Sequence, residues 1–248
     1  PLALCALSMF VCNSVFAESD RTEGIIEEVV VTATYRETDL METPVSISAV
    51  TDEMVRDTGA QDMEGLFTLI PGLSMSTAGG GEGKHRYTVR GVTAQSGYIG
   101  SSPTMGTVGV YIDDVPVTSS LGPDSQMNGT LFDIERVEVL KGPQGTLFGE
   151  GSQGGTIRYL YKKPDPSGFD AAVNLSTANM EDSGDNSSRI DGMLNLPLSD
   201  NAAIRLTAWS SETAGFIDNQ TPFEKDYNTA ESEGVRAAVR YEGETFTA

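Results

Sequence analysis

The sequence given has 248 residues and a formal net charge of −20 at pH 7, a length that allows one large domain or two small ones. Proteins that bind nucleic acids present basic faces to the phosphates, so this charge argues against a nucleic-acid partner. The acidic balance suits a surface that gathers cations or faces a lipopolysaccharide leaflet bridged by divalent metal, and equally a surface that is acidic for solubility alone.

Residues 2–16 form an uncharged, largely apolar stretch, shorter than the ~20 residues that a membrane-spanning helix needs. Small and apolar residues precede Glu18, as a signal peptidase requires. We therefore expect residues 1–17 to be the remainder of an export signal whose start lies upstream; a buried helix is the alternative. Both cysteines, Cys5 and Cys12, lie here, so the mature chain would hold no disulfide and no thiolate metal site.

A strand-forming run from Ile25 to Thr34 follows a short polar leader. Alone, such a run would be an unpaired and adhesive strand edge. It is explained if a partner protein supplies the second strand, which is the β-augmentation mode of recognition. The alternative is an ordinary first strand of the domain that follows. We expect a flexible leader over residues 18–38 that contains this run.

Residues 39–164 show the mixed pattern of an α+β domain. Alternating apolar residues predict a strand over 44–51. Thr51 is placed to cap a short helix, with acidic residues in the first turn and Gly59 as its stop. The further expected elements are a helix over 62–69, a Gly-rich loop over 74–83, a strand over 87–92 and a strand with a turn over 106–117.

The run from Phe132 to Lys163 is the most distinctive part of the chain. Apolar residues interleaved with charges predict a strand over 134–141. The strand breaks at Gly142-Pro143, a turn signal, and a glycine-rich loop follows. A second strand, over 156–161, stops before Pro164.

Residues 165–248 change to period-two alternation in runs of about ten residues, which is typical of transmembrane barrel strands. Long polar connections over 179–188 and 216–233 alternate with tight ones over 198–202 and 242–244, as in outer-membrane proteins. A soluble β-sandwich is the alternative. Four strands cannot close a barrel, and open edges are not tolerated in lipid, so we expect a sequence truncated at both ends. The alternating runs are 169–176, 190–197, 204–209 and 235–242.

No coherent catalytic set is visible, so we expect no enzyme, no cofactor and no metal site. Residues 78–85 do not fit the phosphate-loop pattern, and residues 150–154 do not fit a nucleophile elbow. His85 is the sole histidine of the sequence given, which excludes a multi-histidine metal site within it.

Three elements in order resemble the plug-domain signature of TonB-dependent outer-membrane receptors: the strand-forming run, the R-G strand with Y-I-D, and the V-E-V-L-K-G-P to K-K-P run. Asp114 stands where a glycine is usual and Glu150 where an arginine is common. The resemblance assigns Glu27, Glu28, Val29, Val30, Val31, Thr32, Ala33 and Thr34 to the TonB box. It assigns Gly91, Asp113, Glu138, Gly142, Pro143, Gly154 and Gly155 to the plug motif.

The resemblance implies an α+β plug, a small mixed β-sheet with short helices, followed by the first antiparallel strands of a 22-stranded transmembrane barrel. It implies import of a scarce nutrient across the outer membrane of a Gram-negative bacterium, driven by the proton-motive force. TonB, with ExbB and ExbD, would pair with the box. A ferric siderophore is the expected cargo, with cobalamin, haem or an oligosaccharide as alternatives. Rival classes are a soluble periplasmic β-rich binding protein and an exported enzyme such as a hydrolase.

In the family, basic plug residues are locked by barrel glutamates, and the matching positions here are Arg90 and Lys141, with Arg136 nearby. Lysine cannot form the bidentate fork of arginine, so Lys141 would make the weaker lock. The expected glutamates lie beyond residue 248; the alternative is that all three cations simply solvate a strand face. The resemblance also puts His85 near the outer apex of the plug, as a possible ligand contact.

Overall fold

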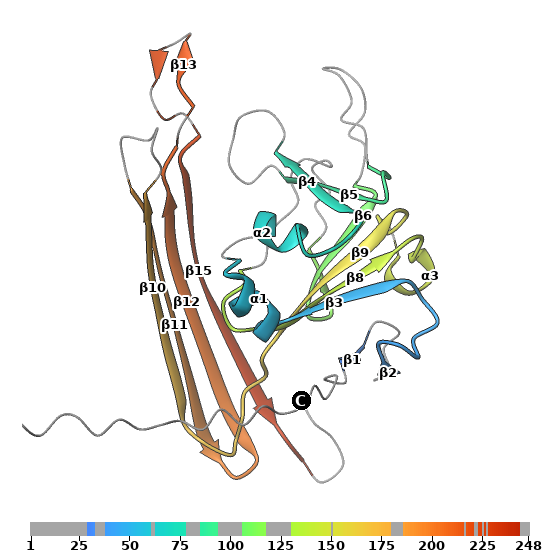
Figure 1. Ribbon diagram of the computed structural model, residues 1–248. Helices are drawn as coiled ribbons and strands as arrows, with labels where there is room; N and C mark the ends of the chain where they lie inside the picture. The colour runs from blue at the N-terminus through green and yellow to red at the C-terminus, as the bar shows by residue number, and fades with distance from the viewer. Residues whose placement is uncertain are drawn as a thin grey trace, which may run out of the picture.

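The computed structural model describes residues 29–32, 38–60, 63–77, 85–93, 106–117, 130–149, 151–179, 186–215, 217–220, 223–224, 226 and 228–243. The expected export signal and Glu27, Glu28, Ala33 and Thr34 of the expected box lie outside these residues. Figure 1 shows two bodies, an α/β domain and a sheet of four long strands. The name α/β domain is used for the described residues between 29 and 163.

The α/β domain is built on a five-stranded mixed sheet with the strand order β3-β8-β9-β6-β7. Its strands are β3 Ile47–Thr51, β6 Val108–Ile112, β7 Val115–Pro116, β8 Ile134–Lys141 and β9 Gly155–Tyr161. The neighbours β6 and β9 run parallel, whereas the other pairs are antiparallel. Strands β8 and β9 lie centrally and are largely buried, which accounts for their density of branched and aromatic residues.

Short helices and two strand pairs complete the domain. They are α1 Asp52–Thr58, α2 Met63–Phe67 and α3 Gly145–Phe148, with β1 Val30–Val31 paired to β2 Thr38–Asp39 and β4 Leu73–Thr77 paired to β5 His85–Val89. The predicted cap of α1 is confirmed, because Met54 N donates to Thr51 Oγ1 at 3.4 Å. Gly59, with a φ of +68°, ends the helix as expected.

Two predictions in this part of the chain are wrong. Residues 74–77, expected in a loop, form most of β4, because β5 supplies a partner strand that no local pattern reveals. The strand expected over 87–92 ends at Val89, since Arg90 and Gly91 adopt φ angles of +51° and +79° and turn the chain. The helix expected over 62–69 is shorter than predicted and is α2.

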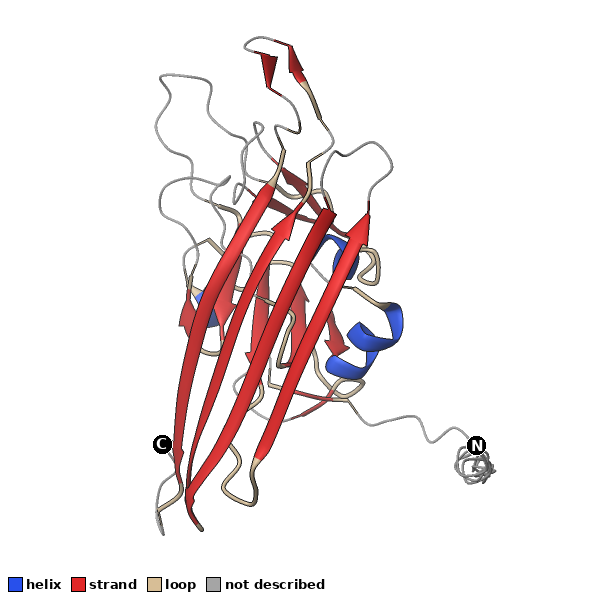
Figure 2. Ribbon diagram, turned by 90° about the vertical axis from the view of Figure 1, so that its left-hand side faces the viewer, coloured by secondary structure: helices blue, strands red, loops and turns tan. Residues whose placement is uncertain are grey.

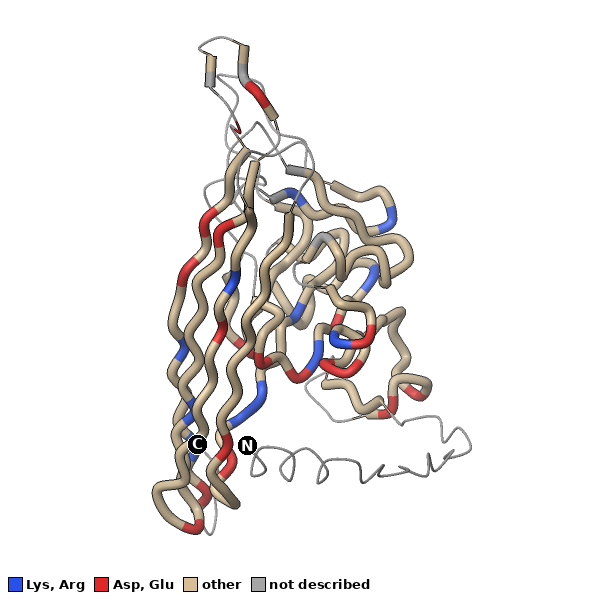
Figure 3. Tube along the Cα trace, turned by 60° about the vertical axis from the view of Figure 1, so that its left-hand side comes forward, with Lys and Arg blue, Asp and Glu red and all other residues tan. Residues whose placement is uncertain are grey.

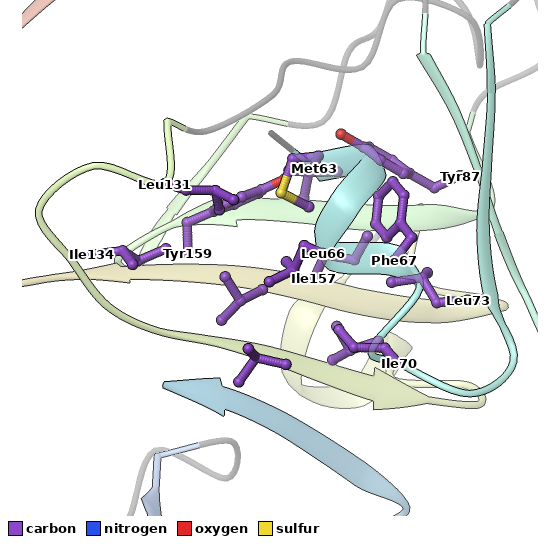
Figure 4. Close-up of a cluster of buried hydrophobic side chains, with 14 of the residues drawn as sticks. Met63, Leu66, Phe67, Ile70, Leu73, Tyr87, Leu131, Ile134, Ile157 and Tyr159 are labelled. Atoms are coloured by element: carbon purple, nitrogen blue, oxygen red, sulfur yellow. The ribbon is translucent and has the colours of Figure 1, made fainter. Parts of the chain in front are cut away.

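The hydrophobic core lies between α2 and one face of the five-stranded sheet (Figure 4). Leu66 and Ile70 have at most 1% of their surface exposed, and they pack in one cluster with Ile157 and Tyr159 of β9. Phe67 meets Tyr87 edge to face, with ring centroids 5.5 Å apart. Full burial of one such aliphatic side chain contributes about 1.5–3 kcal/mol, so this cluster is the main stabilising element of the domain.

The second body is an antiparallel meander with the strand order β10-β11-β12-β15, here called the four-stranded sheet (Figure 2). Its strands are β10 Asp170–Asn179, β11 Asn186–Ser199, β12 Ala202–Thr213 and β15 Ala230–Tyr241. All four strands predicted from alternation are present, and each extends beyond or begins before its predicted range. The tight turn expected over 198–202 is confirmed, since β11 and β12 are separated by residues 200–201.

The connection between β12 and β15 differs from the polar loop expected over 216–233. It contains a small hairpin of β13 Asn219–Gln220 and β14 Phe223–Glu224. The last long strand also begins earlier, at Ala230, because residues 230–234 pair with residues 209–213 of β12 although they lack apolar alternation. Backbone pairing, which a hydrophobic pattern does not report, extends this strand.

The four-stranded sheet has reversed polarity. Its outward side chains are apolar and exposed: Val173 and Val235 have exposed fractions of 72% and 76%. The side chains that face the α/β domain are polar and buried, among them Arg205 at 5% and Asn195 at 0%. Pairing of Val173 with Gly192 and of Asp191 with Trp209 keeps each class on its own face across neighbouring strands. Among the described residues, no helix is long and apolar enough to cross a membrane.

Candidate functional site

Two groups of charged side chains, each centred on a buried carboxylate, stand out among the described residues. One is the Glu138 cluster, made of Thr32, Asp114, Arg136, Glu138 and Arg158. The other is the Asp133 cluster, made of Asp133, Arg205, Thr207 and Arg236. Figure 3 shows that basic and acidic residues occur both along the four strands and in the α/β domain. Each cluster joins parts of the chain that are far apart in sequence.

Glu138 is the centre of the first cluster. It lies on β8, and its side chain has no exposed surface. Arg136 Nε donates to Glu138 Oε1 at 2.8 Å, and Arg158 Nη1 donates to Glu138 Oε2 at 2.7 Å. Both carboxylate oxygens are thus bound by charged donors, which is the condition under which a buried carboxylate is tolerated.

Thr32 attaches the expected box to this cluster. Its backbone N donates to Glu138 Oε1 at 2.8 Å. Its hydroxyl oxygen accepts hydrogen bonds from Arg136 Nη2 and Arg158 Nη1, both at 3.1 Å. Val31 beside it is completely buried. The end of the segment is therefore held by both an apolar contact and charge-assisted hydrogen bonds.

A tight turn between β6 and β7 also reaches the cluster. Arg158 Nη2 donates to Asp114 Oδ1 at 3.1 Å, while the Asp114 side chain is 72% exposed. The turn itself places Asp113 at a φ of +51°, and Asp113 Oδ1 accepts from Tyr161 N at 3.0 Å. The aspartate that replaces the usual glycine at position 114 therefore leaves the turn intact, because the left-handed residue is Asp113.

Asp133 joins the α/β domain to the four-stranded sheet. It stands directly before β8 with a φ of +62° and is 8% exposed. Arg205 of β12 binds it in a fork, with Nε 2.9 Å from Oδ2 and Nη2 2.5 Å from Oδ1. Thr207 Oγ1 donates to Oδ2 at 3.0 Å, and Arg236 Nη2 of β15 lies 3.4 Å from the same oxygen. One carboxylate thus binds two neighbouring strands of the sheet.

Further contacts extend this junction along the chain. The Arg236 guanidinium lies 4.4 Å from the centre of the Tyr161 ring, and its Nη2 donates to Lys162 O at 3.2 Å. Arg189 Nη2 donates to Thr130 Oγ1 at 2.8 Å. Burial in this junction raises the pKa of Tyr161, so its phenol is un-ionised at all physiological pH values.

Asn195 fixes the segment that links the two bodies. Its Oδ1 accepts from Asp165 N at 2.9 Å, and its Nδ2 donates to Asp165 O and Gly168 O, both at 2.8 Å. Arg240 Nη1 donates to Pro164 O at 3.3 Å nearby. The chain therefore leaves the α/β domain along a defined path and not as a free linker.

Of the three cations expected in a plug–barrel lock, Arg90 and Lys141 lie next to each other, whereas Arg136 lies apart from them. Arg90 Nη2 donates to Ser46 Oγ at 2.5 Å and its Nη1 lies 3.5 Å from Lys141 O, whereas Arg136 belongs to the Glu138 cluster. Desolvation, and secondly the charge of Arg90, lower the pKa of Lys141. The pairing of these residues with barrel glutamates stays a prediction.

The plug-motif glycines occupy positions that exclude a side chain. Gly142 has a φ of +114°, and its N donates to Gly154 O at 3.0 Å. A Cβ on Gly155 would stand 2.5 Å from Leu140 O, because β9 passes close to β8 there. Pro143 follows this turn, and Gly91 completes the turn after β5. His85 opens β5, and its side chain lies outside what the structure describes, so its ligand contact stays a prediction.

Sequence reasoning missed Asp133, Arg158, Arg205 and Arg236. A signal existed for two of them, because Arg205 and Arg236 occupy the inward positions of their alternating strands. A cation at an inward position of such a strand calls for a carboxylate across the interface. Nothing in the sequence identifies Asp133 as that carboxylate, since 72 positions separate it from Arg205.

Comparison with known proteins agrees with this geometry. Residues 39–156 match the family model described as TonB-dependent Receptor Plug Domain. The probable TonB-dependent receptor BfrD of Bordetella pertussis is 28% identical over 169 residues, 67% of this chain and 19% of the relative. The pesticin receptor of Yersinia pestis is 31% identical over 127 residues, 50% of this chain and 17% of the relative. The chain thus spans less than a fifth of the length of these relatives.

Solved structures share the fold. The ferric yersiniabactin uptake receptor FyuA from Yersinia pestis superposes with a TM-score of 0.65 at 24% identity, over 79% of this chain and 29% of that chain. The pyoverdine outer membrane receptor FpvA from Pseudomonas aeruginosa gives 0.66 at 22% identity, over 87% and 28%. The expected fold, a mixed-sheet plug with short helices followed by antiparallel strands, is confirmed.

Proposed function

Because the chain belongs to the family of TonB-dependent receptors, we propose that it forms the plug and the first barrel strands of an outer-membrane receptor that imports a ferric siderophore. The proposed organisation is a signal-peptide remainder over 1–17, a leader with the TonB box over 18–38, a plug over 39–164 and barrel strands from 165 onward. Transport, and not catalysis, is the proposed activity, and no cofactor is part of the proposal.

The observation that carries the proposal is the reversed polarity of the four-stranded sheet. Exposed aliphatic side chains such as Val173 and Val235 would be costly in water, but they are stable against lipid hydrocarbon. The buried polar face meets the α/β domain through the Asp133 cluster, as a barrel wall meets a plug. A soluble periplasmic binding protein would need the opposite arrangement, so this rival is disfavoured.

The state of the box supports a role for TonB. Val30 and Val31 form a short strand at the surface of the α/β domain, a form that a partner strand can extend. We propose that TonB, energised through ExbB and ExbD by the proton-motive force, pairs with residues 27–34 and pulls. The force would reach the plug through backbone hydrogen bonds, which depend little on side-chain identity.

The cargo is proposed from the named relatives. They include the catecholate siderophore receptor Fiu of Escherichia coli, 26% identical over 138 residues. This name favours a ferric siderophore over cobalamin, haem or an oligosaccharide. The full-length receptor, produced in a Gram-negative host lacking its own siderophore receptors, should restore uptake of ⁵⁵Fe-loaded siderophores under iron starvation. Uptake of cobalamin, haem or an oligosaccharide alone would overturn the assignment of the cargo.

Fractionation and one substitution test the receptor itself. The full-length protein should sediment with outer membranes and stay there after a urea wash, whereas recovery in the soluble periplasm would overturn the proposal. Val30→Pro removes one donor from the strand that TonB extends, so uptake should be abolished while siderophore binding is unchanged. Val30→Ala keeps the N–H group and should retain uptake. Normal uptake by Val30→Pro would contradict the box assignment.

A further inference from the structure

One backbone edge of the box segment is paired with β2 in this structure, and the other is held at Thr32. Strand β1 pairs antiparallel with β2, with Val30 opposite Asp39 and Val31 opposite Thr38, and Leu40 N donates to Val29 O at 2.9 Å. Backbone groups of successive residues point to opposite edges of a strand. Val29 and Val31 therefore face β2, and Val30 and Thr32 face the opposite edge.

Glu138 binds the opposite edge of β1 at Thr32. Thr32 N, which points away from β2, donates to Glu138 Oε1 at 2.8 Å. A partner that recognises the segment by adding a strand needs a free edge, because its affinity comes from main-chain hydrogen bonds. The partner strand must therefore displace either β2 or the contact with Glu138.

We infer that the partner strand adds along the Val30/Thr32 edge after Thr32 leaves Glu138, while β2 stays paired. This inference rests on the proposed function, because it takes the partner to be the strand-donating periplasmic domain of TonB. In the substrate-free receptor, Glu138 binds Thr32 and so blocks the Val30/Thr32 edge; this contact is called the catch. Glu138 is therefore a positioning residue for the box.

Breaking the Thr32–Glu138 contact and breaking the β1–β2 pairing leave different groups without partners. When Thr32 leaves, the Glu138 carboxylate keeps its ion pairs with Arg136 and Arg158, so no buried charge is left without a partner. Displacing β2 would instead open a backbone ladder on both of its strands. The Glu138 edge is therefore the one that opens at lower cost.

Strand β2 is also braced by the turn that follows it. Thr43 donates through its N and its Oγ1 to Asp39 O, at 3.1 and 2.8 Å. The hydroxyls of Thr38 and Thr43 lie 2.8 Å apart, and Met41 N donates to Asp39 Oδ1 at 2.6 Å. These bonds hold β2 in shape independently of β1, so the β1–β2 pair re-forms readily and can serve as the base on which a third strand adds.

A disulfide across β1 and β2 tests which edge is used. Val30 and Asp39 form a pair of the type that does not exchange hydrogen bonds, whose Cα atoms lie about 4.5 Å apart, within the range of a disulfide. Full-length Val30→Cys/Asp39→Cys receptor should bind the purified periplasmic domain of TonB equally well, within about twofold, when oxidised and reduced. Binding that is lost on oxidation and restored by reductant would overturn the inference, because β2 would then have to leave.

A milder substitution tests the catch. Thr32→Ala removes the hydroxyl that Arg136 and Arg158 contact but keeps the backbone N–H for the partner. The substrate-free receptor should then bind the TonB domain about tenfold more tightly, the effect of one charge-assisted hydrogen bond. Thr68→Ala, which removes a hydroxyl that donates to Gly65 O outside β1, β2 and the Glu138 cluster, is the matched control and should change affinity less than twofold.

The outcomes separate the inference from the function on which it rests. Affinity of Thr32→Ala equal to or weaker than that of the wild-type receptor would overturn the inference, even though TonB binds. A wild-type full-length receptor that binds no TonB domain, with or without siderophore, would overturn the proposed function itself.

Discussion

The α/β domain and the four-stranded sheet bury opposite kinds of side chain. The domain encloses apolar residues such as Leu66 and Ile157 around α2. The sheet turns Val173 and Val235 outward and encloses Arg205 and Asn195. The difference teaches that each face matches the medium it meets, and that the polar groups between the two bodies must find partners in each other. The Asp133 cluster is that partnership.

Removing Asp133 should give the largest effect on the contact between the two regions. Asp133→Ala would leave Arg205 and Arg236 buried without their carboxylate, which should lower the free energy of unfolding by about 3–5 kcal/mol. Urea denaturation of the full-length receptor would measure it. Asp52→Ala, which removes a partly exposed ion pair with Lys162, is the control and should cost at most about 1 kcal/mol. Equal effects of the two substitutions would show that the junction does not hold the bodies together.

The polarity of the sheet can be tested with one pair of neighbours on β10. Val173→Lys puts a charge on the outward face and should destabilise membrane insertion by about 2–4 kcal/mol at mid-depth. Ala172→Lys puts the same charge on the inward face and should be tolerated. The yield of folded receptor in the outer membrane, judged by heat-modifiable gel mobility, is the measurement. A reversed order of the two variants would mean that the lipid face is assigned wrongly.

The link between the regions should respond less strongly. Asn195→Ala removes the side chain that bonds Asp165 and Gly168, whose backbone groups are partly accessible to solvent, so the loss should cost about 0.5–1.5 kcal/mol. Hydrogen exchange of the amides of Asp165, Ser167 and Gly168 should accelerate, while exchange in the hydrophobic core around Leu66 should not change. Ser199→Ala, at the exposed turn of the same strand, provides the control and should leave both rates unchanged.

Lys141 should show the smallest effect, and this effect should change with pH only in the alkaline range. Its pKa is lowered in the folded state by desolvation and then by Arg90, so the protonated lysine opposes folding. This penalty is present at pH values below the folded pKa and disappears as pH rises toward the ordinary lysine value. Arg90→Gln should raise the pKa of Lys141 partway, as measured by NMR of ¹³C-methylated lysines. An unchanged or further lowered pKa would remove Arg90 as a cause.

Sequence patterns correctly predicted those structural features that depend on residues close together in the sequence. Period-two alternation located all four long strands, and Thr51 with Gly59 bounded α1, because these features depend on neighbours in sequence. The loop expected at β4 was wrong because its partner β5 lies eight or more residues away. The charge clusters were out of reach for the same reason, since Thr32 and Glu138 are 106 positions apart. The distinctive run from Phe132 to Lys163 identified β8 as important, but the residues that bind Asp133 and Glu138 could be found only in the folded structure.

Strand β8 connects the Asp133 cluster to the Glu138 cluster through one continuous stretch of backbone. Asp133, immediately before the strand, is fixed to β12 and β15, and Glu138, within it, holds Thr32. At a rise of ~3.3 Å per residue the two carboxylates are separated by about 17 Å of extended backbone. Extended backbone stretches very little, so while Thr32 is bound to Glu138 a shift of β12 and β15 relative to the α/β domain reaches Thr32 along β8 with almost no slack. Once Thr32 has left Glu138, the box segment is no longer coupled through β8 to the four-stranded sheet, and a pull on the segment does not load that sheet by this route.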